Sequence, residues 1–243
     1  MPPPLQPLTA TQAPEAFSES FYRAHGKRYA EINEENRQYV WTSDARFQRD
    51  ADLLEDFMRL LPQGGKGLDA GCCAGARDLD IFCQRGFDAI GLDSIPENIR
   101  LSCERKPHLA SRLFVHDLRE ALLLPDAAFD FILCGYVIQH NEPQDVFGVI
   151  LPELVRVLRP NGALRIIFKH GKGIRSVFDP GYQLTRTFRL YDEGEVLDCL
   201  ETLGLTMERD YVPVRFTDYK LTDHVVFQMR KRVGMGNPRK KQV

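Results

Sequence analysis

The 243-residue sequence has no long apolar segment. Its longest uncharged apolar run lies near residues 131–138, far shorter than the roughly 20 residues that a membrane-spanning helix needs. No basic stretch followed by an apolar one stands at the N-terminus, so we expect no secretory signal. With a net charge of -2, the chain has no overall attraction to nucleic acid or anionic lipid. These absences predict a cytoplasmic protein that binds no membrane and disfavour nucleic acid as a partner.

The six cysteines include no C-x-x-C pair, the spacing that is typical of a zinc site. Most of them lie in apolar strand or helix patterns, so we expect reduced thiols in the core and no metal ion. Apolar residues make up 43% of the chain and charged residues 27%, as in ordinary globular proteins. This length can bury one large α/β core. A monomer and a homodimer remain equally open.

Two helices are predicted before the first strand. The proline-rich segment 1–15 reads as a disordered arm, and helical spacing then covers residues 17–38 and 44–61. Ser43 or Asp44 is the expected N-cap of the second helix. The sequence therefore predicts an N-terminal helical unit, 16–62, ahead of the main domain.

From residue 67 onward, short strands alternate with segments of helix length. We expect strands at 67–69, 88–92, 113–115, 129–134 and 163–168. Such alternation predicts a parallel sheet with helices on both faces, and ligands of such sheets bind at the carboxyl ends of the strands.

The segments around and after the last of these strands are also assigned. Residues 159–162 are predicted as a turn and 169–189 as a loop, while 208–216 and 224–230 are predicted as a terminal antiparallel pair. The main domain thus spans 63–232, and 233–243 is expected to be a solvated basic tail.

Small residues recur at alternate positions after the first predicted strand: Asp69, Gly71, Cys73 and Gly75. Glycine lets the backbone approach a ligand closely, and the free N–H groups of the next helix favour negative charge. The spacing G-x-G-x-x-G is absent, which argues against an NAD-dependent enzyme. The pattern resembles motif I of the class I S-adenosylmethionine (SAM) methyltransferases, D/E-x-G-x-G-x-G, with Cys73 at the middle glycine. A cysteine is tolerated there if its φ is negative, and its side chain narrows the approach to a ligand.

The resemblance implies a Rossmann-like, seven-stranded, mostly parallel sheet that ends in an antiparallel hairpin, with residues 16–62 as a helical lid. It implies SAM as the cofactor. Asp93 stands in a segment similar to G-x-D-x-S-x-x-M-I, so Asp93 and the adjacent Ser94 are expected at the ribose. Asp117 and the backbone N–H of Leu118 are expected at the adenine.

The resemblance also assigns residues at the methionine end of the cofactor. Asp69 is expected to orient the glycine loop, and Arg77 to pair with the methionine carboxylate. In the relatives' motif G-x-G-R-D the arginine follows the glycine directly, whereas here Ala76 separates Gly75 from Arg77. This extra residue turns Arg77 about 100° around a helix, away from the position of the relatives' arginine. Cys134, Gly135 and Tyr136 are expected to line the sulfonium.

The candidates for the acceptor site each have a plain structural alternative. His140 is predicted as a general base or as a pocket-wall or helix-capping histidine. Tyr22 and Tyr29 fit either a lid or ordinary helix packing. Lys169 and His170 open a basic segment that suits an acceptor with a carboxylate or phosphate, or a solvated surface loop.

The leading hypothesis is SAM-dependent methyl transfer to an oxygen or nitrogen of a small-molecule acceptor, and whether this acceptor is anionic is left open. The segment 130–140 is similar to motif IV of small-molecule enzymes and lacks the N/D-P-P-Y/F signature of DNA adenine methyltransferases. A tRNA or protein methyltransferase is one alternative. A non-catalytic module that binds SAM or a nucleoside is the other.

Overall fold

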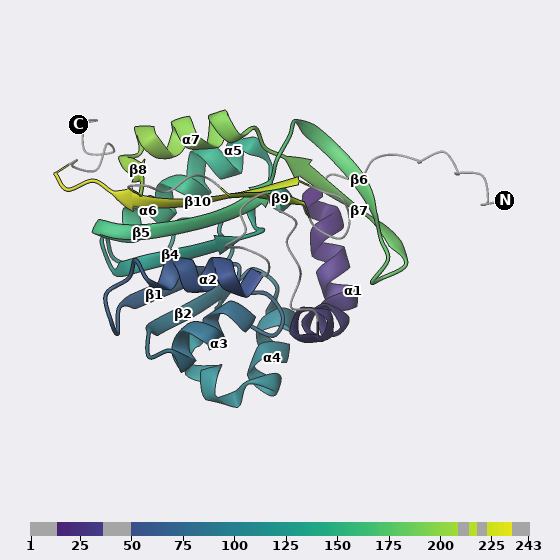
Figure 1. Ribbon diagram of the computed structural model, residues 1–243. Helices are drawn as coiled ribbons and strands as arrows, with labels where there is room; N and C mark the ends of the chain where they lie inside the picture. The colour runs from purple at the N-terminus through teal and green to yellow at the C-terminus, as the bar shows by residue number, and fades with distance from the viewer. Residues whose placement is uncertain (1–13, 36–49, 209–213, 218–222, 235–243) are drawn as a thin grey trace.

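The computed structural model describes residues 14–35, 50–208, 214–217 and 223–234 (Figure 1). The arm up to residue 13, the predicted cap at Ser43 or Asp44 and the tail from residue 235 lie outside these ranges. Within them, no helix combines the length and the apolar character that crossing a membrane requires.

A central sheet in the order β3-β2-β1-β4-β5-β10-β8 organises the chain, with β9 paired to β10. Its strands are β1 (Lys66–Ala70), β2 (Asp88–Asp93), β3 (Leu113–Val115), β4 (Phe129–Gly135), β5 (Leu158–Lys169), β8 (Leu205–Met207), β9 (Val214–Thr217) and β10 (Asp223–Lys231). The first five strands run parallel, and β10 lies antiparallel to β5. This confirms the predicted parallel sheet and its antiparallel terminal strand.

Helices cover both faces of the sheet (Figure 1). One face carries α2 (Asp50–Met58), α3 (Arg77–Gln84) and α4 (Pro96–Arg105), and the other α5 (Pro143–Asp145), α6 (Leu151–Val157) and α7 (Glu193–Thr202). Short helical turns η1 (Pro107–Arg112), η2 (Ile138–His140) and η3 (Val146–Ile150) complete the connections. Two apolar clusters result, one on each face, as expected when strands buried on both sides consist of near-continuous apolar residues.

The long helix α1 (Pro14–Glu35) packs on α4 and on the hairpin strand β7 rather than on the central sheet. Gly26 makes the close approach possible, because a Cβ built there would lie 2.9 Å from Asn98 Oδ1. Helix α1 therefore stands over the edge of the sheet at which β1, β2 and β4 end (Figure 1).

The prediction of a loop over 169–189 is wrong. Most of this segment is an antiparallel hairpin of β6 (Gly173–Asp179) and β7 (Leu184–Leu190), which forms a separate two-stranded sheet. Of the glycines that suggested a loop, Gly171 precedes the hairpin, Gly173 begins it and Gly181 lies in its turn; Gly171 and Gly173 have φ of 135° and 76°. The strands themselves contain β-branched and aromatic residues, among them Ile174, Val177, Phe178 and Phe188, and such residues favour strands.

The turn predicted at residues 159–162 lies inside β5. Leu158 pairs with Phe129 and Ala163 with Phe131, so four residues of β5 bulge out opposite one residue of β4. Asn161 has the left-handed φ of 62° that such a bulge requires. The turn chemistry was therefore recognised correctly, but it interrupts a strand instead of preceding one.

Candidate active site

A pocket opens where the predicted ligand edge of the sheet meets helix α1. Its lining includes most of the residues expected to bind a ligand: Tyr22, Tyr29, Gly71, Cys73, Asp93, Ser94, Asp117, Leu118, Gly135, Tyr136 and His140. These side chains come from α1, from the loops after β1, β2 and β3, and from the end of β4. Parallel strands bring those loops to one edge, which is why residues far apart in the sequence meet there.

The glycine-rich loop after β1 has an unusual backbone. Gly71 has a φ of 91°, and a Cβ there would lie 2.4 Å from Val137 Cγ2. Cys73 has a φ of 58°, so the negative φ at which a cysteine would be tolerated here is not adopted. A side chain in the left-handed region is strained by about 1–3 kcal/mol. The loop holds its shape because the Cys73 backbone N–H donates to Asp93 Oδ2 at 3.0 Å.

Asp93 connects the glycine loop to the start of α4. Its Oδ1 accepts hydrogen bonds from the backbone N–H of Ile95 at 2.9 Å and from Asn98 Nδ2 at 3.1 Å. Burial raises the pKa of Asp93, while these bonds and the one from Cys73 act in the opposite direction. The carboxylate is thereby fixed at the pocket wall, with lone pairs that can accept ligand hydroxyl groups.

Asp117 is already engaged by a neighbour that the sequence did not single out. The backbone N–H and the Nε–H of Arg119 each donate to Asp117 Oδ1 at 2.9 Å, and Arg119 also lines the pocket. Burial raises the pKa of Asp117. An adenine amino group would therefore share this carboxylate with Arg119.

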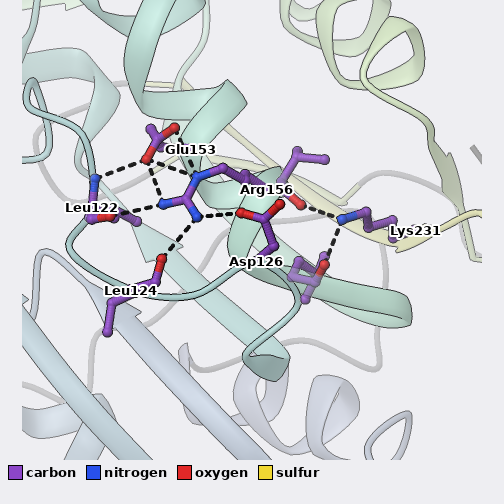
Figure 2. Close-up of polar contacts among 8 residues, drawn as sticks. Leu122, Leu124, Asp126, Glu153, Arg156 and Lys231 are labelled. Carbon is purple, nitrogen blue, oxygen red and sulfur yellow. Dashed lines mark hydrogen bonds and ion pairs between the residues drawn. The ribbon is translucent and has the colours of Figure 1, made fainter. Parts of the chain in front are cut away.

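A buried ion pair anchors the loop that follows Asp117. Glu153 Oε2 accepts a hydrogen bond from the backbone N–H of Leu122 at 2.9 Å, and Arg156 donates to the carbonyl oxygens of Leu122 and Leu124, each at 2.9 Å (Figure 2). Arg156 Nη2 lies 2.8 Å from Glu153 Oε2. This network secures the wall of the pocket from the far side of the sheet.

Four of the predicted cofactor residues lie outside the lining: Asp69, Gly75, Arg77 and Cys134. Burial, with a contribution from Asp78, raises the pKa of Asp69 to about 8. The Gly75 backbone N–H donates to Ser102 Oγ at 2.8 Å, and Arg77 Nη2 lies 2.7 Å from Asp78 Oδ1. These contacts are within the protein, so the structure groups these residues behind the pocket rather than in it.

The two basic residues predicted for the acceptor also lie outside this lining. Lys169 is buried at the end of β5, with its Nζ 2.9 Å from His224 Nε2 and 4.7 Å from the centroid of the Phe188 ring. His170 follows it and has an Nδ1 that is buried with no hydrogen-bond partner in the part of the chain that the structure describes. Both stand next to the pocket, not on its surface.

His140 lies at the end of the pocket opposite Asp117, in contact with helix α1. Its Nδ1 is 2.6 Å from Ser18 Oγ and its Nε2 is 3.4 Å from Tyr22 Oη. Burial, together with the charges of Arg186 and Lys169, holds the pKa of His140 well below its usual range. Ser18 and Arg186 were not predicted as site residues, because nothing in the sequence places α1 and β7 beside the loop after β4.

The segment 68–166 matches the family model described as a methyltransferase domain. A curated relative, the 2-methyl-6-phytyl-1,4-hydroquinone methyltransferase of Synechocystis sp., is 31% identical over 104 residues, which cover 43% of this chain and 32% of that protein. The chain therefore spans about a third of the length of this relative.

Solved structures share the fold at low sequence identity. A 1,6-didemethyltoxoflavin-N1-methyltransferase from Burkholderia thailandensis, crystallised with S-adenosylhomocysteine (SAH), is 21% identical, with a TM-score of 0.59 over 95% of this chain and 94% of that one. A [4+2]-cyclase is 16% identical, with a TM-score of 0.63 over 93% and 98% of the two chains. The match over residues 68–166, the sheet order and the glycine loop together support a SAM-dependent methyltransferase domain with the class I fold.

Proposed function

We propose that this protein transfers the methyl group of SAM to an oxygen or nitrogen atom of a small, anionic acceptor. The observation that carries the proposal is one pocket lined at one end by Asp93 and Asp117 and at the other by Tyr22 and His140. The first end has the acceptors and apolar walls that a nucleoside needs. The second end has groups that can take a proton from a nucleophile.

The residues at the nucleoside end fit SAM. Asp93 and Ser94 supply oxygen atoms for the ribose hydroxyls, and Leu118, whose backbone N–H is the proposed donor to an adenine ring nitrogen, lines the same pocket. A Cβ built on Gly135 would meet no heavy atom within 4 Å, so the wall is open where the resemblance expects the sulfonium. When bound, SAM supplies a methyl group that is already activated by the positive sulfur.

An anionic acceptor is supported by two buried cations beside His140. Lys169 Nζ lies 4.7 Å from the Phe188 ring centroid, and the Arg186 guanidinium carbon lies 4.9 Å from the same centroid. Both side chains are at most 5% exposed. A carboxylate or phosphate near this ring would be attracted strongly, since charges interact more in a site with little water. The similar hydroquinone and toxoflavin methyltransferases are named for small-molecule acceptors, which supports a small molecule as acceptor here.

The position of helix α1 supports its role as a lid. Ser18, Tyr22 and Tyr29 of this helix all line the pocket, and Arg23 forms an exposed ion pair with Glu97 of α4 at 2.7 Å. A ligand at Asp93 would lie beneath α1. We therefore propose that the helix moves to admit the cofactor and covers it once bound.

A second candidate is SAM binding without methyl transfer. The likeness to a [4+2]-cyclase favours it, because the same fold there carries a protein named for other chemistry. The strained Cys73 in the pocket also favours this candidate, because its side chain narrows the pocket and weakens the binding of SAM.

The test is product formation. The protein is incubated with SAM labelled in its methyl group and a panel of small phenols, carboxylic acids and amines, and labelled product and SAH are both measured. We expect equal amounts of both for at least one acceptor, and a loss of at least tenfold in His140→Gln. The exposed His108→Gln is the matched control. SAM binding without product from any class of acceptor would favour the second candidate.

A further inference from the structure

Four side chains from three separate parts of the chain form one hydrogen-bonded series. Arg186 Nη2 of β7 lies 3.2 Å from Tyr22 Oη of α1, which lies 3.4 Å from His140 Nε2. His140 Nδ1 lies 2.6 Å from Ser18 Oγ, one helical turn before Tyr22. Ser18, Tyr22 and His140 line the pocket, whereas Arg186 is almost fully buried and lies outside its lining.

The chemistry of the donors gives this series a direction. A guanidinium has only donors, so Tyr22 Oη accepts from Arg186, and its own hydrogen can be donated to His140 Nε2. A neutral imidazole that accepts at Nε2 carries its hydrogen on Nδ1, from which it donates to Ser18 Oγ. This direction of the series corresponds to one tautomer of His140, with its hydrogen on Nδ1 and Nε2 as the basic atom.

The surroundings hold these groups in place and keep the imidazole neutral. The Arg186 guanidinium carbon lies 4.0 Å from the Phe21 ring centroid, and its Nη1 lies 3.3 Å from Asp179 Oδ2. Burial and the positive charges of Arg186 and Lys169 hold the pKa of His140 low. Burial likewise raises the pKa of Tyr22, so both groups are uncharged at neutral pH and Nε2 is free to accept a proton.

We propose that Tyr22 and His140 form a proton relay that deprotonates the acceptor, with Ser18 and Arg186 as positioning residues. This rests on the proposed function and narrows its substrate class to acceptors whose nucleophile carries a proton, such as a hydroxyl or an ammonium group. The acceptor donates its proton to Tyr22 Oη as Tyr22 passes its own to His140 Nε2. The lone pair of the acceptor atom forms the bond to the methyl carbon, and the electrons of the broken carbon–sulfur bond return to sulfur. The positive charge ends on His140.

The experiment is NMR spectroscopy of the full chain with ¹⁵N-labelled histidine, which reports the protonation of each ring nitrogen. The His140 resonances are assigned by their loss in His140→Gln. At pH 7 we expect a neutral ring with its hydrogen on Nδ1. Tyr22→Phe should move the Nε2 resonance toward that of an unbonded nitrogen, and Ser18→Ala should shift the tautomer toward Nε2–H.

Arg186 is tested by a graded series. Arg186→Met should raise the pH at which His140 takes up a proton, and Arg186→Lys should restore most of the wild-type value. Arg189→Met is the matched control, since Arg189 lies on the same strand but pairs with Glu142. Either Nε2–H or a charged ring in the wild type at pH 7 would overturn the relay, as would equal effects of Arg186→Met and Arg189→Met. SAM titrations of the same samples separate the two proposals: absence of SAM binding contradicts the proposed function and not the tautomer.

Discussion

The backbone N–H of Cys73 donates to the carboxylate of Asp93 at 3.0 Å. This bond joins the loop after β1 to the end of β2 across the floor of the pocket. It also holds a cysteine at a φ of 58°, in a conformation that glycine adopts freely. Cys73, which stands in place of the middle glycine of the motif, is thus held in a strained backbone conformation by Asp93, the residue expected to bind the ribose.

Replacing Cys73 by glycine should stabilise the protein. The substitution relieves the left-handed strain and opens the pocket, so we expect about 1 kcal/mol more free energy of unfolding and several-fold tighter SAM binding. Urea denaturation and calorimetry measure the two effects. Cys73→Ala is the control, because alanine removes the thiol but keeps the Cβ. Equal stability of the two variants would show that the backbone at this position is not strained.

Asp69 should make the stability depend on pH in a defined direction. Its pKa in the folded protein is about 8, above the value near 4 of an unfolded chain. At pH values between these two pKa values, the folded state therefore binds a proton that the unfolded state does not. The contribution of Asp69 is therefore most favourable below about pH 4 and is lost as the pH rises to about 8. Relative to Asp69→Asn, the wild type should lose stability steadily between pH 5 and pH 8 in urea titrations. A constant difference across that range would mean that Asp69 is ionised in the fold.

The ion pair of Glu153 and Arg156 should contribute far more to the free energy of unfolding than an exposed ion pair does. Arg156→Met leaves the carboxylate of Glu153, which is 3% exposed, without its charged partner. We expect a loss of about 3 kcal/mol in the free energy of unfolding. Arg100→Met, which breaks the exposed ion pair with Glu104 on α4, should cost about 0.3 kcal/mol. Similar losses in the two variants would contradict the assignment of an anchoring role.

The lid proposal predicts protection of α1 by the cofactor. Saturating SAM should slow hydrogen exchange of the backbone amides of residues 17–35, because closure over the ligand suppresses local opening. Gly26→Val, which places a side chain against Asn98, should reduce that protection, whereas Val at the exposed Ala24 should not. Exchange in α1 that is unchanged by SAM would rule out a lid.

The sequence predicted the sheet well, because alternation of strands and helices and the glycine loop after β1 are local signals. It placed Asp93, Asp117 and Gly135 at one edge of the sheet, where the structure gathers them into the pocket. The antiparallel hairpin at the end of the sheet was also implied by the family resemblance and is confirmed.

The acceptor end could not be predicted in the same way. Ser18 and Arg186 meet His140 only through packing of α1 against β7, over 122 residues from Ser18 to His140 in sequence. The prediction of a loop in place of the hairpin of β6 and β7 gave its glycines and basic residues more weight than its β-branched and aromatic residues. The contacts of Ser18 and Arg186 in this region produce no periodic pattern in the sequence from which they could be predicted.

The central claim is that the edge formed by β1 and β2 binds SAM through Asp93. Calorimetric titration of the wild type with SAM and with SAH tests it most directly, beside Asp93→Ala and the control Asp88→Ala at the opposite, exposed end of the same strand. The account predicts micromolar binding to the wild type and to Asp88→Ala, and a loss of at least tenfold in Asp93→Ala. Equal affinity of Asp93→Ala and the wild type, or no binding of either ligand, would contradict it.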